Sequence, residues 1–435
     1  MTTVTTPAER WTTGALVAFW LPLALSWMMM IVAQPIASIA ISRLVDPEVH
    51  LAAYGVTFDL ALLLESPIIM LLSASVALTR DQASYRLLRR LTLWIGGIMT
   101  GLYAVAAFTP AYGFIVRGLL GIPDAVAVQA QPALQLLLPW IVAIAWRRFH
   151  QGPLILRGDT RLISYGTVLR LLSLTAILAG GVAWPVLPGA TLGALALTVS
   201  VIVESAVNTV WAMPVVRRLP RASGVSLTMP QIIRFCTPLA ATDIIRSVVR
   251  PAVAAGISRA VLPQVSLAAW PVAASLISVI SSGAMAFQEV TVAVIEDRLT
   301  YLRVRRFILG VGAVITLLAM AIVFTPLIRV YLAGVVRLPP TLLPHVVYGM
   351  QIMLPLPFLM ALRNLFRGVL IQQRSTSPIQ LAMIANAAVL VLTLVAGAAA
   401  GWTGITVATV ATLAAQIAEV LVLFAYSRRA ARRLV

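Results

Sequence analysis

Residues 237–251 read TPLAATDIIRSVVRP and lie inside a long apolar segment that predicts a membrane-spanning helix. The stretch nevertheless contains Asp243, Arg246 and Arg250. At 100° per residue both arginines fall within about 60° of Asp243, so the three charges share one face of the helix. A charged residue at the centre of a membrane helix costs roughly 2.5–3.5 kcal/mol even by insertion experiments. This face is therefore expected to point at protein or at a water-filled cavity.

The composition of the whole chain is that of a polytopic membrane protein. Of its 435 residues, 60% are hydrophobic and 11% are charged, whereas soluble proteins have about 25% charged residues. The one cysteine, Cys236, excludes an internal disulfide and a thiolate metal cluster. The sequence contains no CxxC, HExxH, P-loop or GxSxG motif. We therefore expect no metal site, no catalytic residue and no enzyme activity.

The apolar segments predict an all-α fold with twelve membrane-spanning helices, an even number of crossings. The predicted spans are 14–42, 50–78, 88–112, 125–146, 163–184, 190–214, 231–258, 266–294, 307–328, 341–362, 379–398 and 403–426.

The distribution of the basic residues, all of them arginine, predicts the orientation of these spans. Loops on one side hold 23 of the 32 arginines and loops on the other side hold 5. The 23 arginines of the first group include Arg147, Arg148, Arg363 and Arg367, which are thus predicted to lie in loops. By the positive-inside rule this predicts a multi-pass protein of the inner (plasma) membrane with the N- and C-termini in the cytoplasm. The net charge of +18 is thus a topology signal, with membrane lipids as partners and no nucleic acid.

The two halves of the chain repeat one pattern. Shifting the sequence by 216 aligns prolines, glycines and arginines, and a shift of 215 continues the match to the end. Because six is even, two six-span units enter the membrane as parallel repeats with a pseudo-twofold axis along the membrane normal. We predict an N-lobe at 1–216, a cytoplasmic linker at 217–230 and a C-lobe at 231–435. The matched pairs include Phe19/Phe235, Pro22/Pro238, Pro35/Pro251, Arg89/Arg305, Gly152/Gly368 and, at the shorter shift, Glu204/Glu419.

Four matched prolines interrupt the first and seventh spans. Pro22, Pro35, Pro238 and Pro251 loosen the helical backbone and are predicted to act as hinges. The alternative is that they are ordinary scaffold residues, since membrane helices carry more proline than soluble ones.

The matched glycines have a simpler prediction. Gly152 and Gly368 follow the predicted fourth and tenth spans, where glycine permits tight turns at a helix end.

Two lobes that each begin with a proline-containing helix resemble the multidrug and toxic compound extrusion (MATE) superfamily. So does the segment closing the fourth span, residues 148–161, RFHQGPLILRGDTR. Within the superfamily, residues 51–56 (LAAYGV), Pro67 and the Arg80-Asp81 pair are similar to the progressive ankylosis branch. Members of that branch export small polyanions such as pyrophosphate, citrate or nucleotides. The resemblance implies a transporter that works by alternating access.

One feature departs from the superfamily pattern. Many MATE drug pumps use an acidic residue on the first span for proton coupling, whereas this first span has none between Gly14 and Ser42. Any coupling residue is therefore expected elsewhere in the chain.

The charged face of the seventh span is the predicted substrate site, because guanidinium groups bind carboxylates and phosphates bidentately. The alternative is a structural ion pair between Asp243 and Arg246. The predicted substrate-binding residues are Asp243, Arg246 and Arg250, with their first-span repeat mates Trp27, Met30 and Gln34.

The other carboxylates in the spans are candidates for coupling or for structure. Asp59 and Glu65 on the second span are predicted to carry a coupling H⁺ or Na⁺, since a carboxylate in a dry pocket can hold a proton. Asp59 alternatively pairs with Arg250 across the lobes. Glu289 is expected to snorkel or to pair with loop arginines at the cytoplasmic end of its span.

Glu204 and Glu419 are repeat mates, which favours a structural role common to both lobes, with coupling as the alternative. An arginine from the fifth span, Arg170, is the expected partner of Glu204.

The leading hypothesis is a secondary active transporter that exports a small organic or phosphorylated anion through a central inter-lobe cavity, as a monomer and without a cofactor. A cation-coupled multidrug or organic-cation efflux pump is the first alternative, and the paired arginines count against it. A flippase for lipids or lipid-linked headgroups is the second, with the arginines holding a pyrophosphate headgroup.

Overall fold

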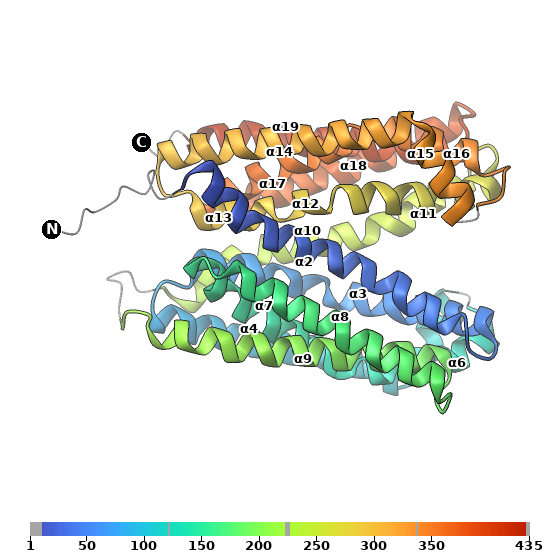
Figure 1. The fold of residues 1–435 in the computed structure, drawn as a ribbon, viewed down its shortest axis with the longest axis horizontal. Helices are drawn as coiled ribbons and strands as arrows, with labels where there is room; N and C mark the ends of the chain where they lie inside the picture. The colour runs from blue at the N-terminus through green and yellow to red at the C-terminus, as the bar shows by residue number, and fades with distance from the viewer. Residues whose placement is uncertain (1–10, 121, 222–226, 336–337, 432–435) are drawn as a thin grey trace. The chain divides into compact units, whose positions relative to one another are not determined.

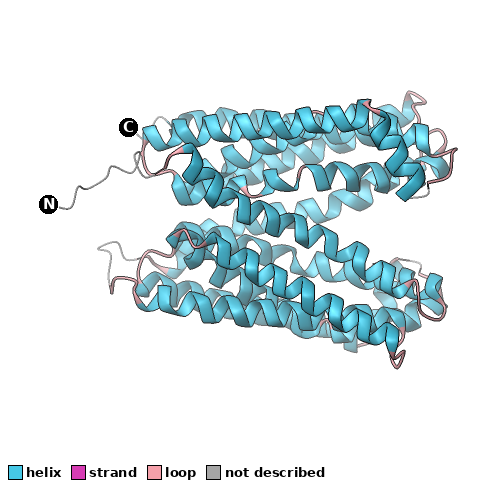
Figure 2. Ribbon diagram, in the orientation of Figure 1, coloured by secondary structure: helices cyan, strands magenta, loops and turns pink. Residues whose placement is uncertain are grey.

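The computed structural model describes residues 11–120, 122–221, 227–335 and 338–431, which are almost entirely helical (Figure 2). Apart from one isolated backbone bridge, these ranges form no strand. The elements, many of them labelled in Figure 1, are α2 (Thr13–Ile41), α3 (Pro47–Leu78), α4 (Gln82–Phe108), α5 (Ala111–Gly113), the π-helix η1 (Phe114–Leu119), α6 (Asp124–Leu136), α7 (Leu138–Arg157), α8 (Thr160–Ala183), α9 (Gly189–Arg217), α10 (Met229–Ser258), α11 (Pro263–Ile280), α12 (Ser282–Met285), α13 (Phe287–Val294), α14 (Arg298–Phe324), α15 (Pro326–Val330), the π-helix η2 (Tyr331–Val335), α16 (Leu343–Met353), α17 (Leu356–Gln372), α18 (Ser377–Ala399) and α19 (Gly404–Ala431).

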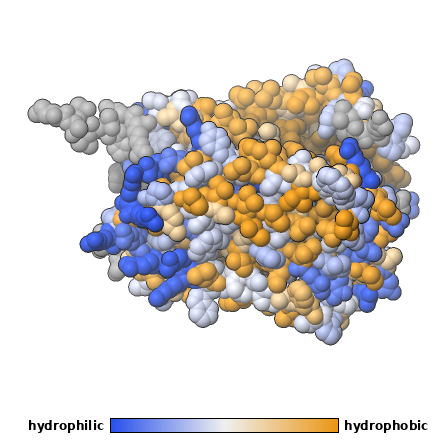
Figure 3. All heavy atoms as spheres, turned by 60° about the horizontal axis from the view of Figure 1, so that its bottom comes forward, coloured by the Kyte–Doolittle hydropathy of each residue, from blue (hydrophilic) through white to orange (hydrophobic). Residues whose placement is uncertain are grey.

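The expected all-α membrane architecture is confirmed. By length and composition, the described residues form ten segments able to cross a membrane, and the bent pair of α6 and α7 makes an eleventh. Helix α10 has 30 residues and is long enough as well, but it carries Arg234, Asp243, Arg246 and Arg250. On the face drawn in Figure 3, hydrophobic side chains cover the middle and hydrophilic ones gather toward the ends. A protein surrounded by hydrocarbon shows this pattern.

The chain forms two compact units. The N-unit is Leu25–Asp243, and the C-unit combines Met1–Ala24 with Ile244–Val435. The boundaries therefore fall inside α2 and α10, shortly after the matched prolines Pro22 and Pro238. Both helices continue through these prolines.

The two compact units do not coincide with the two sequence repeats. The boundary between the compact units falls inside α2 and again inside α10, so the two ends of each of these helices belong to different units. The lobe boundaries drawn from the repeat, 1–216 and 231–435, stay a prediction, and so does the hinge role of the prolines.

Unusual backbone conformations recur at the repeat offset. Asp46 and Leu262, which are repeat mates, have φ of 49° and 53°. Gly158 and Arg374, matched by the same offset, have φ of 90° and 56°. Non-glycine residues rarely adopt positive φ, so these matches are a specific sign that both units use one chain path.

Helix starts recur in the same way. Asp81 accepts a hydrogen bond from the backbone N–H of Ser84 at 2.7 Å and caps α4. Asp297 accepts one from the N–H of Thr300 at 2.7 Å and caps α14. Both are capping boxes, in which cap and third residue satisfy each other's backbone N–H groups.

Two glycines let helices approach closely. A Cβ at Gly152 in α7 would collide with Ser75 of α3, and one at Gly368 in α17 would collide with Thr291 of α13. The expectation that these glycines form turns is wrong, because both lie inside helices that continue to Arg157 and Gln372. The positive-φ positions that end these helices come later in the chain.

The point where the repeat shortens by one residue can be located from contacts in the last two helices of each unit. Gly181 packs against Leu192, and the equivalent Gly397 packs against Val407. Gly181 and Gly397 are 216 residues apart, whereas Leu192 and Val407 are 215 residues apart. The C-unit therefore lacks one residue between Gly397 and Val407. Residues of α8 and α18 lie before this point, so they are equivalent at an offset of 216.

The fourth span differs most from the prediction. In place of one segment at 125–146, the chain forms α6 and α7, bent by 44°, and α7 ends only at Arg157. The predicted span stopped at the first pair of arginines because charge is disfavoured in hydrocarbon. The structure places those arginines inside the helix bundle.

Candidate binding site

A buried ion pair joins α7 to α9 in the N-unit. Nη1 of Arg147 donates to Oε2 of Glu204 at 2.7 Å, and the two side chains are 1% and 0% exposed. Nη1 of Arg170 in α8 lies 3.7 Å from the same oxygen. The hydroxyl of Thr167, also in α8, donates to the other carboxylate oxygen at 3.1 Å. The expected pairing of Arg170 with Glu204 is thus present, with Arg147 as a closer partner.

Two further charges complete a cluster of five. Arg148 is buried in α7, and its guanidinium lies 5.2 Å from the ring centroid of Trp27 in α2, a cation–π contact. Glu65 is buried in α3 within electrostatic reach of all three arginines. We name this set the arginine cluster; its members are Glu65, Arg147, Arg148, Arg170 and Glu204.

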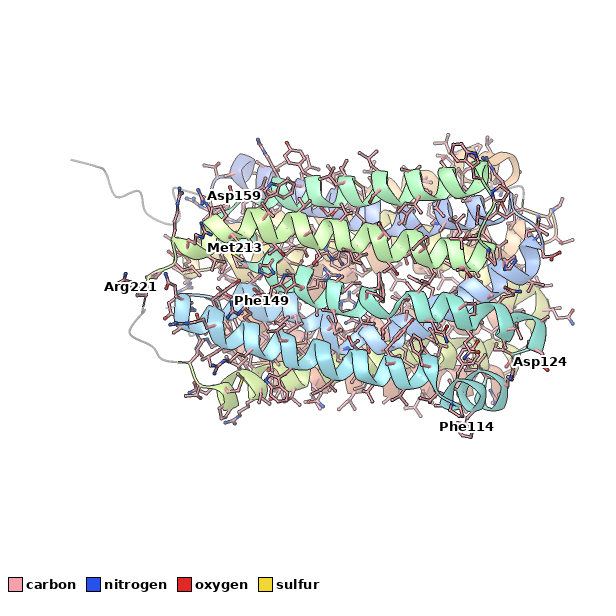
Figure 4. All side chains as sticks on the ribbon, turned by 90° about the horizontal axis from the view of Figure 1, so that it is seen from below. Phe114, Asp124, Phe149, Asp159, Met213 and Arg221 are labelled. Atoms are coloured by element: carbon pink, nitrogen blue, oxygen red, sulfur yellow. The ribbon has the colours of Figure 1, made fainter. Side chains whose placement is uncertain are left out.

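The sequence brings these side chains together through small residues at the helix contacts. Gly152 draws α7 against α3, which carries Glu65. Gly166 faces Asn208, and a Cβ at Gly166 would lie 2.9 Å from Oδ1 of Asn208, so α8 approaches α9 closely. Figure 4 shows Phe149, the residue after Arg148, inside the bundle and nearer the Asp159 end than the Asp124 end.

Several polar atoms in this interior make no hydrogen bond with the residues that the structure describes. They are Nε and Nη2 of Arg147, Nε and Nη1 of Arg170, and both amide atoms of Asn208. A buried donor without an acceptor costs about 1–3 kcal/mol, and more when it is charged. These groups therefore favour water molecules or a ligand that offers acceptor oxygens.

The first-span residues predicted to line the substrate site lie beside this cluster. Trp27 contacts Arg148 as described. Met30 lines a narrow crevice together with Arg170. Gln34 lies close to the Tyr54 hydroxyl, which is itself within electrostatic reach of Arg170. The full lining of the crevice is Met29, Met30, Ala33, Thr167, Arg170, Leu171 and Leu174.

The seventh-span part of the predicted substrate site is described only in part. Asp243 in α10 is buried, Arg246 is partly buried, and both take part in polar interactions. The side chains of Arg250 and Pro251 lie outside the described residues. The substrate role of these α10 side chains stays a prediction.

The two candidate coupling residues of α3 lie in different surroundings. Glu65 belongs to the arginine cluster, whereas Asp59 is exposed and takes part in interactions of its own. The proposed pairing of Asp59 with Arg250 stays untested, because it involves an undescribed side chain. Glu289 is buried in α13, so the expectation that it snorkels at a helix end is wrong. Its alternative, pairing with an arginine, stays a prediction.

The equivalent positions of the C-unit carry fewer charges and have different partners. Oε2 of Glu419 accepts a hydrogen bond from Nδ2 of Asn386 at 3.0 Å. Asn386 in α18 is the repeat mate of Arg170 in α8. The repeat also pairs Arg147 with Arg363, whose Nη1 lies 3.4 Å from Oε1 of Gln416. The remaining cluster positions, Glu65 and Arg148, have the equivalents Ser281 and Asn364.

The sequence-based assignment of four arginines to loops is wrong. Arg147 and Arg148 lie in α7, Arg363 and Arg367 lie in α17, and Arg147, Arg148 and Arg367 are buried. The repeat contained a usable signal, because an arginine and a glutamate recur together as Arg147 with Glu204 and Arg363 with Glu419.

Metal binding finds no support in this region. Among the described residues, no group of three or more His, Cys, Asp or Glu side chains is placed to hold a metal ion. The polar atoms of the arginine cluster are mainly N–H donors, which suit an anion.

No protein-family model and no curated protein matches this chain. Solved structures do match over nearly its whole length. One is an outward-facing multidrug resistance MATE family transporter of the MOP superfamily, at 16% identity and TM-score 0.77, covering 99% of this chain and 97% of that one. A second is a MOP superfamily transporter from Pyrococcus furiosus, at 15% identity and TM-score 0.77 with the same coverage. A third is a eukaryotic MATE transporter, at 13% identity and TM-score 0.75, covering 97% and 99%.

These likenesses establish the fold. The chain has the fold of the MATE transporters, as the resemblance in the sequence implied.

Proposed function

We propose that the protein is a secondary membrane transporter for a small organic or phosphorylated anion, such as citrate, pyrophosphate or a nucleotide. The fold supports the transporter class, since the matched structures are described as transporters. The predicted setting, a monomer in the plasma membrane with cytoplasmic termini, remains part of this proposal.

The arginine cluster is the observation that carries the choice of an anion. The cluster itself holds three buried arginines and two buried glutamates, inside a unit built from membrane-spanning helices. The same unit has two further buried carboxylates, Asp81 and Asp243, which are not members of the cluster. Arg147 and Arg170 each keep two guanidinium nitrogens without a hydrogen-bond acceptor among the described residues. A guanidinium fork matches the geometry of carboxylate and phosphate oxygens, so an anion would satisfy both the charge and the donors.

A multidrug efflux pump is the second candidate. One matched structure is a multidrug resistance transporter, and α2 presents the apolar run Trp27 to Met30 next to the crevice. Flexible methionines suit varied apolar ligands. A cationic drug would, however, have to approach an excess of positive charge. The Pyrococcus furiosus transporter is described as having a binding pocket of reverse polarity that suggests a different function.

Uptake into liposomes containing the purified protein separates the two candidates. Pyrophosphate, citrate and ADP are offered in parallel with a cationic dye, and liposomes without protein give the background. The proposal expects at least one anion to enter above background, while the dye does not. Uptake of the dye with none of the three anions would contradict it and favour the drug pump.

A further inference from the structure

Glu65 differs from the other buried carboxylate of the arginine cluster. Glu204 is held by Arg147, Arg170 and Thr167. Glu65 is 5% exposed and feels the charges of the arginines, yet it makes no hydrogen bond or ion-pair contact with the described residues. The Glu65 carboxyl group therefore lies near the arginines without forming an ion pair with any one of them.

The charges around Glu65 come from two neighbouring helices. Arg147 and Arg148 act on it from α7, and Arg170 acts from α8. Glu204 of α9 shares two of these arginines. Helices α4 and α6 also pack on α3, but no described charged group of theirs acts on Glu65. Its charge state thus depends on how far the arginines are neutralised by other anions.

We propose that Glu65 couples proton uptake to anion binding at the arginine cluster. This inference rests on the proposed function. A bound anion would take over the arginine donors and stand close to the Glu65 carboxylate. Two like charges near each other in a low-dielectric interior repel strongly, so Glu65 accepts one proton from the aqueous side when the anion binds. It returns the proton when the anion leaves.

The repeat supports a role beyond folding. The equivalent position in the C-unit is Ser281, so the six-helix unit folds around that site without a carboxylate. By contrast, Glu204 has an equivalent glutamate, Glu419, which fits a structural role common to both units.

The coupling has a definite sign. Anions bind more tightly at lower pH, where Glu65 is already protonated, and the affinity falls as the pH rises and Glu65 ionises. Replacement by glutamine fixes the neutral state, so the affinity of Glu65→Gln lacks this contribution and changes with pH only as the anion itself titrates. The wild-type difference between mildly acidic and mildly alkaline pH is expected to be on the order of tenfold.

Titration calorimetry of pyrophosphate, citrate and ADP tests this coupling. Measurements with the purified full-length protein in two buffers of different ionisation enthalpy give the number of protons taken up per bound anion. The wild-type protein should take up more protons than Glu65→Gln, by as much as one per anion. The proton chemistry of the anion itself cancels in this difference. Asp59→Asn tests the other predicted coupling residue of the same helix, and it keeps the wild-type proton uptake if the coupling resides on Glu65. Asp124→Asn, an exposed carboxylate of the same unit, is the control and should behave as wild type.

The outcomes distinguish the coupling from the function. Equal proton uptake by wild type and Glu65→Gln overturns the coupling while anion binding stands. Loss of proton uptake in Asp59→Asn but not in Glu65→Gln overturns it as well. If none of pyrophosphate, citrate and ADP binds to the wild-type protein, the proposed function fails and the coupling with it. Should Glu65→Gln not fold, Glu65→Ser introduces the residue found at position 281 and is judged by the same criteria.

Discussion

The two units of this protein share a backbone path and differ in the charges of their interiors. Capping boxes, positive-φ positions and glycine contacts recur at fixed offsets in both. Around the repeated pair Glu204 and Glu419, however, the N-unit places Arg170 where the C-unit places Asn386. The repeat thus separates what the fold requires from what only one unit contains.

The proposed function assigns anion binding to the positions where the two units differ. An asparagine is sufficient to hold the buried carboxylate in the C-unit, at 3.0 Å. The guanidinium of Arg170 is therefore not needed for folding a unit of this type. Burying an extra cation is unfavourable unless it gains a partner, and a transported anion would supply one.

The largest expected effect is on stability at the two repeated glutamates. Glu204→Gln removes the ion pairs of Glu204 with Arg147 and Arg170, which should destabilise the fold by about 3–5 kcal/mol. Glu419→Gln keeps the hydrogen bond to a neutral amide and should cost about 1 kcal/mol or less. Thermal unfolding in detergent would compare the two variants with wild type. Equal losses of thermal stability in the two variants would show that the two carboxylates contribute equally to the fold.

A smaller effect is expected where the units agree. Gly152→Ala and Gly368→Ala each force a Cβ into a facing helix, against Ser75 and Thr291. Overpacking of this kind typically costs about 1–3 kcal/mol. Because the contacts are equivalent, the two variants should lose similar amounts of thermal stability. Marked asymmetry would argue that the helix contacts of the two units are less alike than the repeat indicates.

The smallest effect is expected at the capping boxes. Asp81→Ala and Asp297→Ala each remove one N-cap, which costs about 1 kcal/mol. Hydrogen bonding from the backbone N–H of Thr300 lowers the pKa of the Asp297 carboxyl. The contribution of this cap is therefore present above the ordinary aspartate range and is lost as the pH falls through the lowered pKa.

Unfolding measured at several pH values checks this contribution. The difference in free energy of unfolding between Asp297→Ala and wild type should become smaller in acid. A difference that stays constant in acid would contradict the assignment of this contribution to the Asp297 cap.

Much of the fold was predictable from sequence because apolar length, arginine distribution and the repeat offset are properties of the chain alone. The site was less predictable. Arg147 and Arg148 were assigned to a loop, since sequence reasoning treats an arginine pair as a span end. The burial of Arg147 is compensated by its ion pair with Glu204, and this contact between residues far apart in the chain is evident only from the three-dimensional structure. Trp27, Met30 and Gln34 were predicted to bind substrate because they are the repeat mates of the charged residues of α10, and that role stays a prediction. The described arginines near them, Arg148 and Arg170, belong to the N-unit.

The N-unit cluster is proposed to bind an anion with the help of Arg170, an arginine whose equivalent in the C-unit is an asparagine. Calorimetric titration of pyrophosphate into wild type and Arg170→Asn tests this most directly, because the variant introduces the residue that the C-unit carries at the equivalent position. We expect Arg170→Asn to unfold near the wild-type temperature and to bind pyrophosphate on the order of tenfold to 100-fold more weakly than wild type. A folded Arg170→Asn protein with wild-type affinity would contradict it.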